Sequence, residues 1–367
     1  MNDRVRVTWD DLKFGEELPW NVYDQNNKLL LSAGHTISNQ ETMENLRQYV
    51  LYRNVIDREH GRQNKQKTIN VFAEVDHYID RLAHIFADID AASPSCKEKI
   101  ERLARDLLSM CRHEPDATLA LLRAPNKFTY SSFYALQRAI MCGMMAVQEN
   151  IYPDEEIEIV AAALTVNVGM HQIQDEIRGQ MRFPSDEQQY ILDQYPSKSH
   201  AMLVDAGVEN SHWLGIVRDH KACSEGRVTL DEASPGTIML AVANLYSETL
   251  DSSAYNLPWS ADEALDKYFA DTPFENGHYA RLILEIMTVY PPGIFVKLTN
   301  NEIAIVIQRG KQNPKLPILK SIEGENGHRY ASPLLRDCSV NDYTINDFTD
   351  YDHKDMLNYS KLWGYVK

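Results

Sequence analysis

The spacing of apolar residues predicts that most of the chain is helical. From Val71 to Ile89, apolar residues recur at alternating intervals of three and four, which places them along one face of a helix. Similar spacing continues through the middle of the chain, so we expect one long helical region there. The other predicted helices cover residues 98–112, 116–123, 131–150, 154–166, 185–195, 198–206, 213–220, 235–250, 261–270 and 276–288.

The pattern changes to that of strands near both ends. Residues 21–24 and 28–31 are short, largely apolar segments around an Asn-rich turn and predict a β-hairpin, followed by a short helix at 39–49. Residues 294–298 and 303–307 flank an Asn-Asn turn and predict a second hairpin, with a third strand at 316–322. The expected fold is therefore mainly α, with a small N-terminal α+β module and a C-terminal β-hairpin appendage.

The polar and apolar segments also predict the domain boundaries. Residues 57–68 are polar and show no apolar periodicity, which favours a linker. The last thirty residues mix Asp with Tyr and Phe; they are most simply a segment lying on the domain, and an acidic-aromatic partner peptide is the alternative. The predicted division is an N-terminal module at 1–60, a linker at 61–68, a helical domain at 69–289, and an appendage with a tail at 290–367.

Charge and composition narrow the classes of partner and compartment. The 367 residues include 37 Lys and Arg against 53 Asp and Glu, a formal charge of −16, which argues against a nucleic-acid partner. The most apolar stretch, 157–168, is well short of the roughly 20 residues that span a bilayer. The start of the chain does not resemble a signal peptide, and the five cysteines form no CxxC pair. We therefore expect a cytoplasmic protein without a membrane span.

Several common catalytic signatures are missing from the sequence. It contains no GxGxxG, no P-loop, no GxSxG and no HExxH. His171, His200, His212 and His220 lie within fifty residues, but no two have the i, i+4 spacing that places two ligands on one helix face. These histidines are therefore interpreted as surface or core residues, and no metal site is predicted from them.

Five fragments along the chain carry a resemblance to a known family. They are residues 9–18, 113–130, 162–170, 238–246 and 290–304. In this order they resemble the HD-GYP family, helical metal-dependent phosphodiesterases that hydrolyse cyclic di-GMP in bacterial signalling. The resemblance implies an HD-type helical domain, and 162–170 would correspond to the segment that carries the family's His-Asp pair.

The resemblance also implies where metal ligands would lie, and most of these positions have changed. Of seven implied ligand positions, only His220 keeps a ligand-type side chain; valine cannot coordinate, and a neutral amide is a poor substitute for a bridging carboxylate. Met170 replaces the implied lysine, Ala222 the implied glutamate, and the GYP loop is absent from 223–228. The sequence thus predicts a pseudoenzyme with no catalytic residues, metal or cofactor. The seven positions are Tyr134, Val166, Asn167, Tyr195, His220, Lys221 and Asn244.

The function expected from this resemblance is that of a catalytically inactive regulatory or interaction protein in cyclic di-GMP signalling. Its partner would be another protein, for example a diguanylate cyclase. One alternative is a residual metal-dependent cyclic di-GMP phosphodiesterase. Another is a non-hydrolytic effector that binds cyclic di-GMP, with Lys221 and His220 contacting a phosphate. The simplest interpretation of Tyr134, Val166, Tyr195 and Met170 is a former metal cavity refilled by apolar and aromatic side chains.

Overall fold

The structure is a computed structural model, and it divides into two compact units, Met1–Thr68 and Ile69–Lys367, each described by itself. The predicted linker at 61–68 lies outside the described residues, as do most of the predicted helices at 39–49 and 261–270. The structure describes residues 4–8, 11–12, 18, 22–25, 29–31, 37, 46, 49–54, 69–124, 128–180, 183–250, 269–275, 277–310, 312–339 and 343–366.

The N-terminal unit contains a small antiparallel sheet in the order β1-β4-β2-β3. Strands β2 and β3 form the hairpin predicted around the Asn-rich turn, with Val22 opposite Leu31. Apolar residues from the whole unit, including Leu12, Ile37 and Leu51, make its own small core. The strands are β1 (Arg4–Arg6), β2 (Val22–Tyr23), β3 (Leu29–Leu31) and β4 (Tyr52–Asn54).

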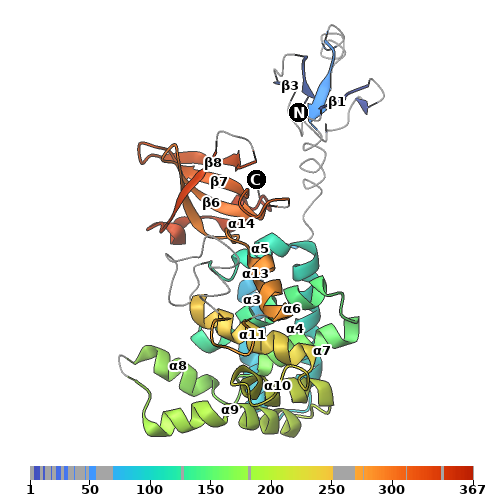
Figure 1. The fold of residues 1–367 in the computed structure, drawn as a ribbon, viewed down its shortest axis with the longest axis vertical. Coiled ribbons are helices and arrows are strands. Elements are labelled where there is room, and N and C mark those ends of the chain that lie inside the picture. The colour runs from blue at the N-terminus through green and yellow to red at the C-terminus, as the bar shows by residue number, and fades with distance from the viewer. Residues whose placement is uncertain are drawn as a thin grey trace. The chain divides into compact units, whose positions relative to one another are not determined.

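The second unit is mainly a helical bundle, so the predicted fold class is confirmed (Figure 1). Helix α6 lies at its centre and packs against α3, α4, α7, α8, α11 and α13, and most of its residues from Ser131 to Ala146 are buried. Across the described part of the chain, no helix combines the length and apolarity that crossing a bilayer requires. The helices are α3 (Val71–Asp90), α4 (Cys96–His113), α5 (Pro115–Ala120), α6 (Tyr130–Gln148), α7 (Pro153–Thr165), α8 (His171–Gly179), α9 (Asp186–Asp205), α10 (Ser211–Ser224), α11 (Pro235–Leu250) and α13 (His278–Met287).

Two helices differ from the prediction. The separate helices expected at 185–195 and 198–206 are one continuous helix, α9, with Pro196 inside it. Helix α8 was not predicted: it has no buried residue, and its apolar face consists of only two side chains, Ile173 and Ile177. Both differences affect the site described below, because α8 and α9 form two of its walls.

The C-terminal part forms a larger sheet than the predicted hairpin. The hairpin and third strand are present as β5, β6 and β7, but two more strands complete an antiparallel sheet in the order β8-β7-β6-β5-β9. The tail supplies β9, and Arg309, just after β6, pairs with Asp116 of α5 at 2.6 Å. The strands are β5 (Phe295–Leu298), β6 (Ile303–Gln308), β7 (Ile318–Glu323), β8 (Arg329–Asp337) and β9 (Ile345–Thr349), and α14 (Tyr359–Leu362) follows.

Candidate functional site

The helical bundle brings the seven positions singled out in the sequence into one region. Tyr134 comes from α6, Tyr195 from α9, and Asn244 from α11. The remaining positions lie at the end of α7 and in the last part of α10. These are Val166, Asn167, His220 and Lys221.

The centre of this region is a charged side chain that the sequence analysis did not single out, Arg138 of α6. It is fully buried, at 0% exposure. Its Nη1 donates to the side-chain oxygens of Asn167 at 2.9 Å and Asn244 at 3.0 Å. Its guanidinium carbon lies 4.2 Å from the ring centre of Tyr134, close enough for a cation–π interaction. One arginine therefore contacts three of the seven positions.

Beside Arg138, Tyr195 and His220 form a buried hydrogen-bonded pair with a defined protonation. The Tyr195 hydroxyl lies 2.6 Å from Nε2 of His220, and Nδ1 of His220 lies 2.9 Å from the carbonyl of Val217. A carbonyl only accepts, so Nδ1 carries the proton and Nε2 accepts from Tyr195. Burial lowers the pKa of His220 to about 3 and raises that of Tyr195 above its ordinary value, which keeps both groups neutral.

Lys221 has a structural contact that explains the continuity of α9. Pro196 has no backbone N–H and cannot donate to the carbonyl four residues earlier, that of Leu192. The Lys221 ammonium donates to this carbonyl at 3.0 Å and pairs with the carboxylate of Asp193 at 3.3 Å. The freed acceptor is therefore satisfied, and the helix continues where the sequence predicted a break.

The turn after α7 is held against α9 by Ser199. Its hydroxyl donates to the carbonyl of Val166 at 2.7 Å and accepts from the backbone N–H of Gly169 at 2.9 Å. A Cβ on Gly169 would lie 2.8 Å from the backbone nitrogen of Ser199 and 2.9 Å from the carbonyl of Tyr195. Glycine is thus required at 169 by the close approach of the two backbones, which places Asn167 next to Arg138.

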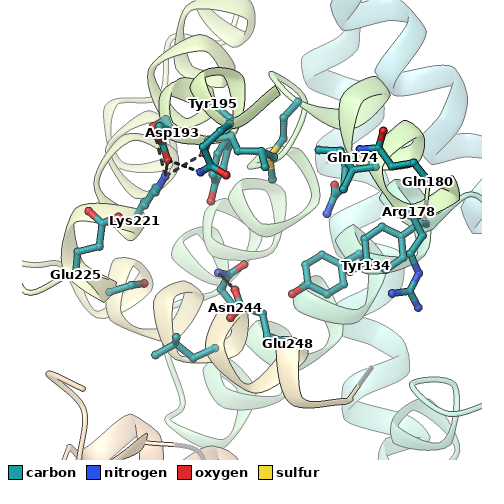
Figure 2. Close-up of a pocket in the computed structure, with 17 residues that line it drawn as sticks. Tyr134, Gln174, Arg178, Gln180, Asp193, Tyr195, Lys221, Glu225, Asn244 and Glu248 are labelled. Carbon is teal, nitrogen blue, oxygen red and sulfur yellow. Dashed lines mark hydrogen bonds and ion pairs between the residues drawn. The ribbon is translucent and has the colours of Figure 1, made fainter. Parts of the chain in front are cut away.

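A pocket of about 630 Å³ opens beside these residues (Figure 2). Gln174, Arg178 and Gln180, with Tyr134, line one side; Asp193, Tyr195, Lys221 and Glu225 line the opposite side. Asn244 and Glu248 of α11 lie between the two sides. Of the seven positions, Tyr134, Tyr195, Lys221 and Asn244 line the pocket, whereas the fully buried Val166, Asn167 and His220 lie behind its walls. His220 therefore does not face the pocket as the predicted phosphate contact requires.

Alternating arginine and tyrosine side chains connect the pocket wall to the buried centre. The guanidinium of Arg178 lies 4.8 Å from the ring centre of Tyr130, and the Tyr130 and Tyr134 rings stack at 5.2 Å. Arg138 lies on the far side of this set, over Tyr134. Helix α8 is also held by Asp175, which accepts from the backbone and hydroxyl of Ser131, each at 2.8 Å.

The donor set at the centre does not fit a divalent metal. Among the described residues, no three His, Cys, Asp or Glu side chains lie together so that they could hold a metal ion. The two oxygens that converge there belong to the neutral amides of Asn167 and Asn244, and a guanidinium already occupies both. Metal ions with oxygen preference are held by carboxylates, and a fixed positive charge opposes their binding.

No family model matches the chain. Two curated proteins are similar to it in sequence. The chain is 21% identical over 200 residues to the cyclic di-GMP phosphodiesterase PdeB of Borreliella burgdorferi, covering 53% of this chain and 52% of that protein. It is 22% identical over 223 residues to the cyclic di-GMP phosphodiesterase PA4108 of Pseudomonas aeruginosa, covering 58% and 52%. The chain thus spans about half the length of the curated relatives it matches.

A solved structure, Bd1817, an HDG"Y"P protein from Bdellovibrio bacteriovorus, aligns with a TM-score of 0.47 and 14% identity, over 77% of this chain and 100% of that chain. The prediction that the chain is not an enzyme is contradicted by the curated matches, since both relatives are named phosphodiesterases. The prediction had relied on changed residues alone.

Proposed function

We propose that this chain, whose assignment to the HD-GYP family is supported by its curated relatives, is a cyclic di-GMP signalling protein that binds the dinucleotide in the pocket between α6, α8, α9, α10 and α11. The observation that carries the proposal is the pocket itself. Its volume of about 630 Å³ suits a ligand of this size, and it lies at the positions that the family resemblance marks as the site.

The side chains that line the pocket match the chemical groups of a cyclic guanine dinucleotide. Lys221 and Arg178 are cations that can bind phosphate oxygens. The carboxylates of Asp193 and Glu248 are acceptors for the N–H groups on the pairing edge of guanine.

Lys221 contributes to the pocket through the flexible end of its side chain. Its ammonium now pairs with Asp193, whose side chain is 54% exposed. A phosphate oxygen can take over this contact at little cost, because exposed ion pairs are weak, while the contact to the Leu192 carbonyl remains.

Isothermal titration calorimetry of the full chain with cyclic di-GMP tests the proposal. We expect binding in the micromolar range or tighter, at least tenfold weaker binding by Arg178→Ala and Lys221→Ala, and weaker binding of cyclic di-AMP. Arg105→Ala is the matched control, since Arg105 is exposed on α4 and, among the residues that the structure describes, forms an ion pair only with Glu101. Absence of heat at high micromolar nucleotide, or unchanged affinity of both pocket variants, would overturn the proposal.

The same samples show what happens to the bound dinucleotide. Incubation of the chain with cyclic di-GMP, with and without added Mn²⁺, followed by chromatography, measures whether linear product forms. Mass spectrometry of the product identifies the bond that is cut. The regulatory role and the protein partner, such as a diguanylate cyclase, stay predictions of the sequence.

A further inference from the structure

We infer that the guanidinium of Arg138 is the resident cation of this site and takes the place of divalent metal ions. The inference goes beyond the proposed function, because it concerns how the positive charge of the site is supplied. It starts from the disagreement between the donor set and a metal centre, and it rests on the contacts of a single buried side chain.

The geometry places the guanidinium where the implied ligand positions converge. Nη1 of Arg138 bridges Asn167, in the turn after α7, and Asn244 of α11. Its Nε donates to the carbonyl of Tyr134 at 3.2 Å, and the ring of Tyr134 covers the guanidinium. The contacts come from α6, from the turn after α7 and from α11, as metal ligands would, but each partner is a neutral oxygen or an aromatic face.

The positive charge of Arg138 has no direct counter-ion. Within the described part of the chain no carboxylate lies at ion-pair distance from it, and its Nη2 is buried without a hydrogen-bond partner. The carboxylate of Glu248 acts on Arg138 through space, and Asn244 lies between the two groups, since its Nδ2 donates to this carboxylate at 3.3 Å. A buried cation without an anion is costly, unless an anion binds close by.

The charge of Arg138 lies directly behind the pocket. Tyr134 and Asn244, both of which contact Arg138, also line the cavity. The guanidinium therefore gives this wall a positive potential, which is weakly screened because Arg138 and Tyr134 are both buried in the protein. If the pocket binds a nucleotide, as the proposed function states, this potential attracts the phosphates of that nucleotide.

The first experiment measures metal on the protein alone and needs no nucleotide. The full chain is purified without chelator, its Fe, Mn and Zn contents are measured by mass spectrometry, and its thermal unfolding is followed with EDTA and with excess MnCl₂. We expect substoichiometric metal and a melting temperature that is the same in both conditions. Stoichiometric metal that EDTA removes, or a rise of several degrees with Mn²⁺, would overturn the inference.

The second experiment neutralises the cation without removing it. Asn167→Asp has nearly the same shape and places a carboxylate 2.9 Å from Nη1, forming a buried ion pair. We expect this variant to remain folded, to gain no response to Mn²⁺, and to bind cyclic di-GMP at least tenfold more weakly. Arg138→Gln should weaken binding similarly, and Arg138→Lys less. The control is Asn150→Asp, the same change at an exposed position after α6.

The outcomes separate this inference from the proposed function. If the wild-type chain binds no cyclic di-GMP, the proposed function fails, and the metal measurement alone decides the role of Arg138. If Asn167→Asp gains a Mn²⁺-dependent rise in melting temperature or binds the nucleotide more tightly, the position behaves as a metal ligand and the inference is overturned.

Discussion

Lowering the pH from 7 to 5 should destabilise the protein through His220. Burial lowers the pKa of His220 to about 3 in the folded chain, whereas an unfolded histidine titrates near 6.5. Below about pH 6.5 the unfolded state therefore binds a proton that the folded state excludes, and stability falls as the pH falls. Integrating this difference from pH 7 to pH 5 gives a loss of about 2 kcal/mol. This loss in unfolding free energy hardly depends on the pKa of His220 in the folded chain, as long as that pKa is well below 5.

The assay is urea unfolding of the wild-type chain and of His220→Gln at pH 7, 6 and 5. Glutamine can accept from Tyr195 but does not titrate, so the difference in unfolding free energy between the two proteins should shrink by about 2 kcal/mol over this range. Other groups contribute equally to both proteins and cancel. His77→Gln, at an exposed position on α3, should follow the wild type. A difference that stays constant within about 0.5 kcal/mol would refute a neutral buried His220.

Two further changes test the packing of the site and of the C-terminal sheet. Gly169→Ala should lower the unfolding free energy by about 1–3 kcal/mol in urea titrations, because the new Cβ would meet the backbone of α9. The control is Gly215→Ala, which should be neutral or stabilising because nothing lies within 4 Å of its Cβ. Equal effects of the two substitutions would contradict the close-approach argument. Glu302→Gln should cost about 3 kcal/mol at pH 7, because Glu302 accepts two bonds from Arg336. Those bonds are the main reason that the pKa of Glu302 falls to about 2. The cost of Glu302→Gln should therefore diminish as the pH falls from about 4.5 towards 2. A cost that is independent of pH would contradict the ion pair between Glu302 and Arg336.

The sequence predicted the helices that bury an apolar stripe and failed where burial is partial. Helix α3 was predicted within one residue, because its stripe faces the core. Helix α8 has no buried residue and only two apolar ones, Ile173 and Ile177, and β8 is mostly exposed along its length, so neither offers an apolar pattern long enough to predict it. The predicted break at Pro196 followed from the hydrogen bond that proline removes from a helix. The Lys221 ammonium, from another helix, donates to the Leu192 carbonyl instead, so the helix continues. Such long-range compensation is not visible in local patterns.

For the site, the sequence indicated a region but not what fills it. The seven positions came from a resemblance, which says which residues are replaced and not which side chain moves into the space. Arg138 had a signal of its own, because it is the one charged residue between Tyr134 and Gln148 on the otherwise apolar α6. A charge inside such a stretch is expected to have a specific partner, since lone buried charges are rare. Its partners, however, lie 29 and 106 residues away, and only the fold identifies them.

The two asparagines that contact Arg138 also set the charge of the pocket in a strongly acidic protein. Across the whole chain, acidic residues exceed basic ones by 16, so an anionic ligand is repelled by most of the surface. Around the pocket, three cations, Arg138, Arg178 and Lys221, offset the three described carboxylates, those of Asp193, Glu225 and Glu248. Carboxylates in place of Asn167 and Asn244 would add two negative charges beside the same cavity, which only a metal ion or further cations could offset. The amides and the arginine therefore form one consistent set, because together they keep this region free of excess negative charge without a metal.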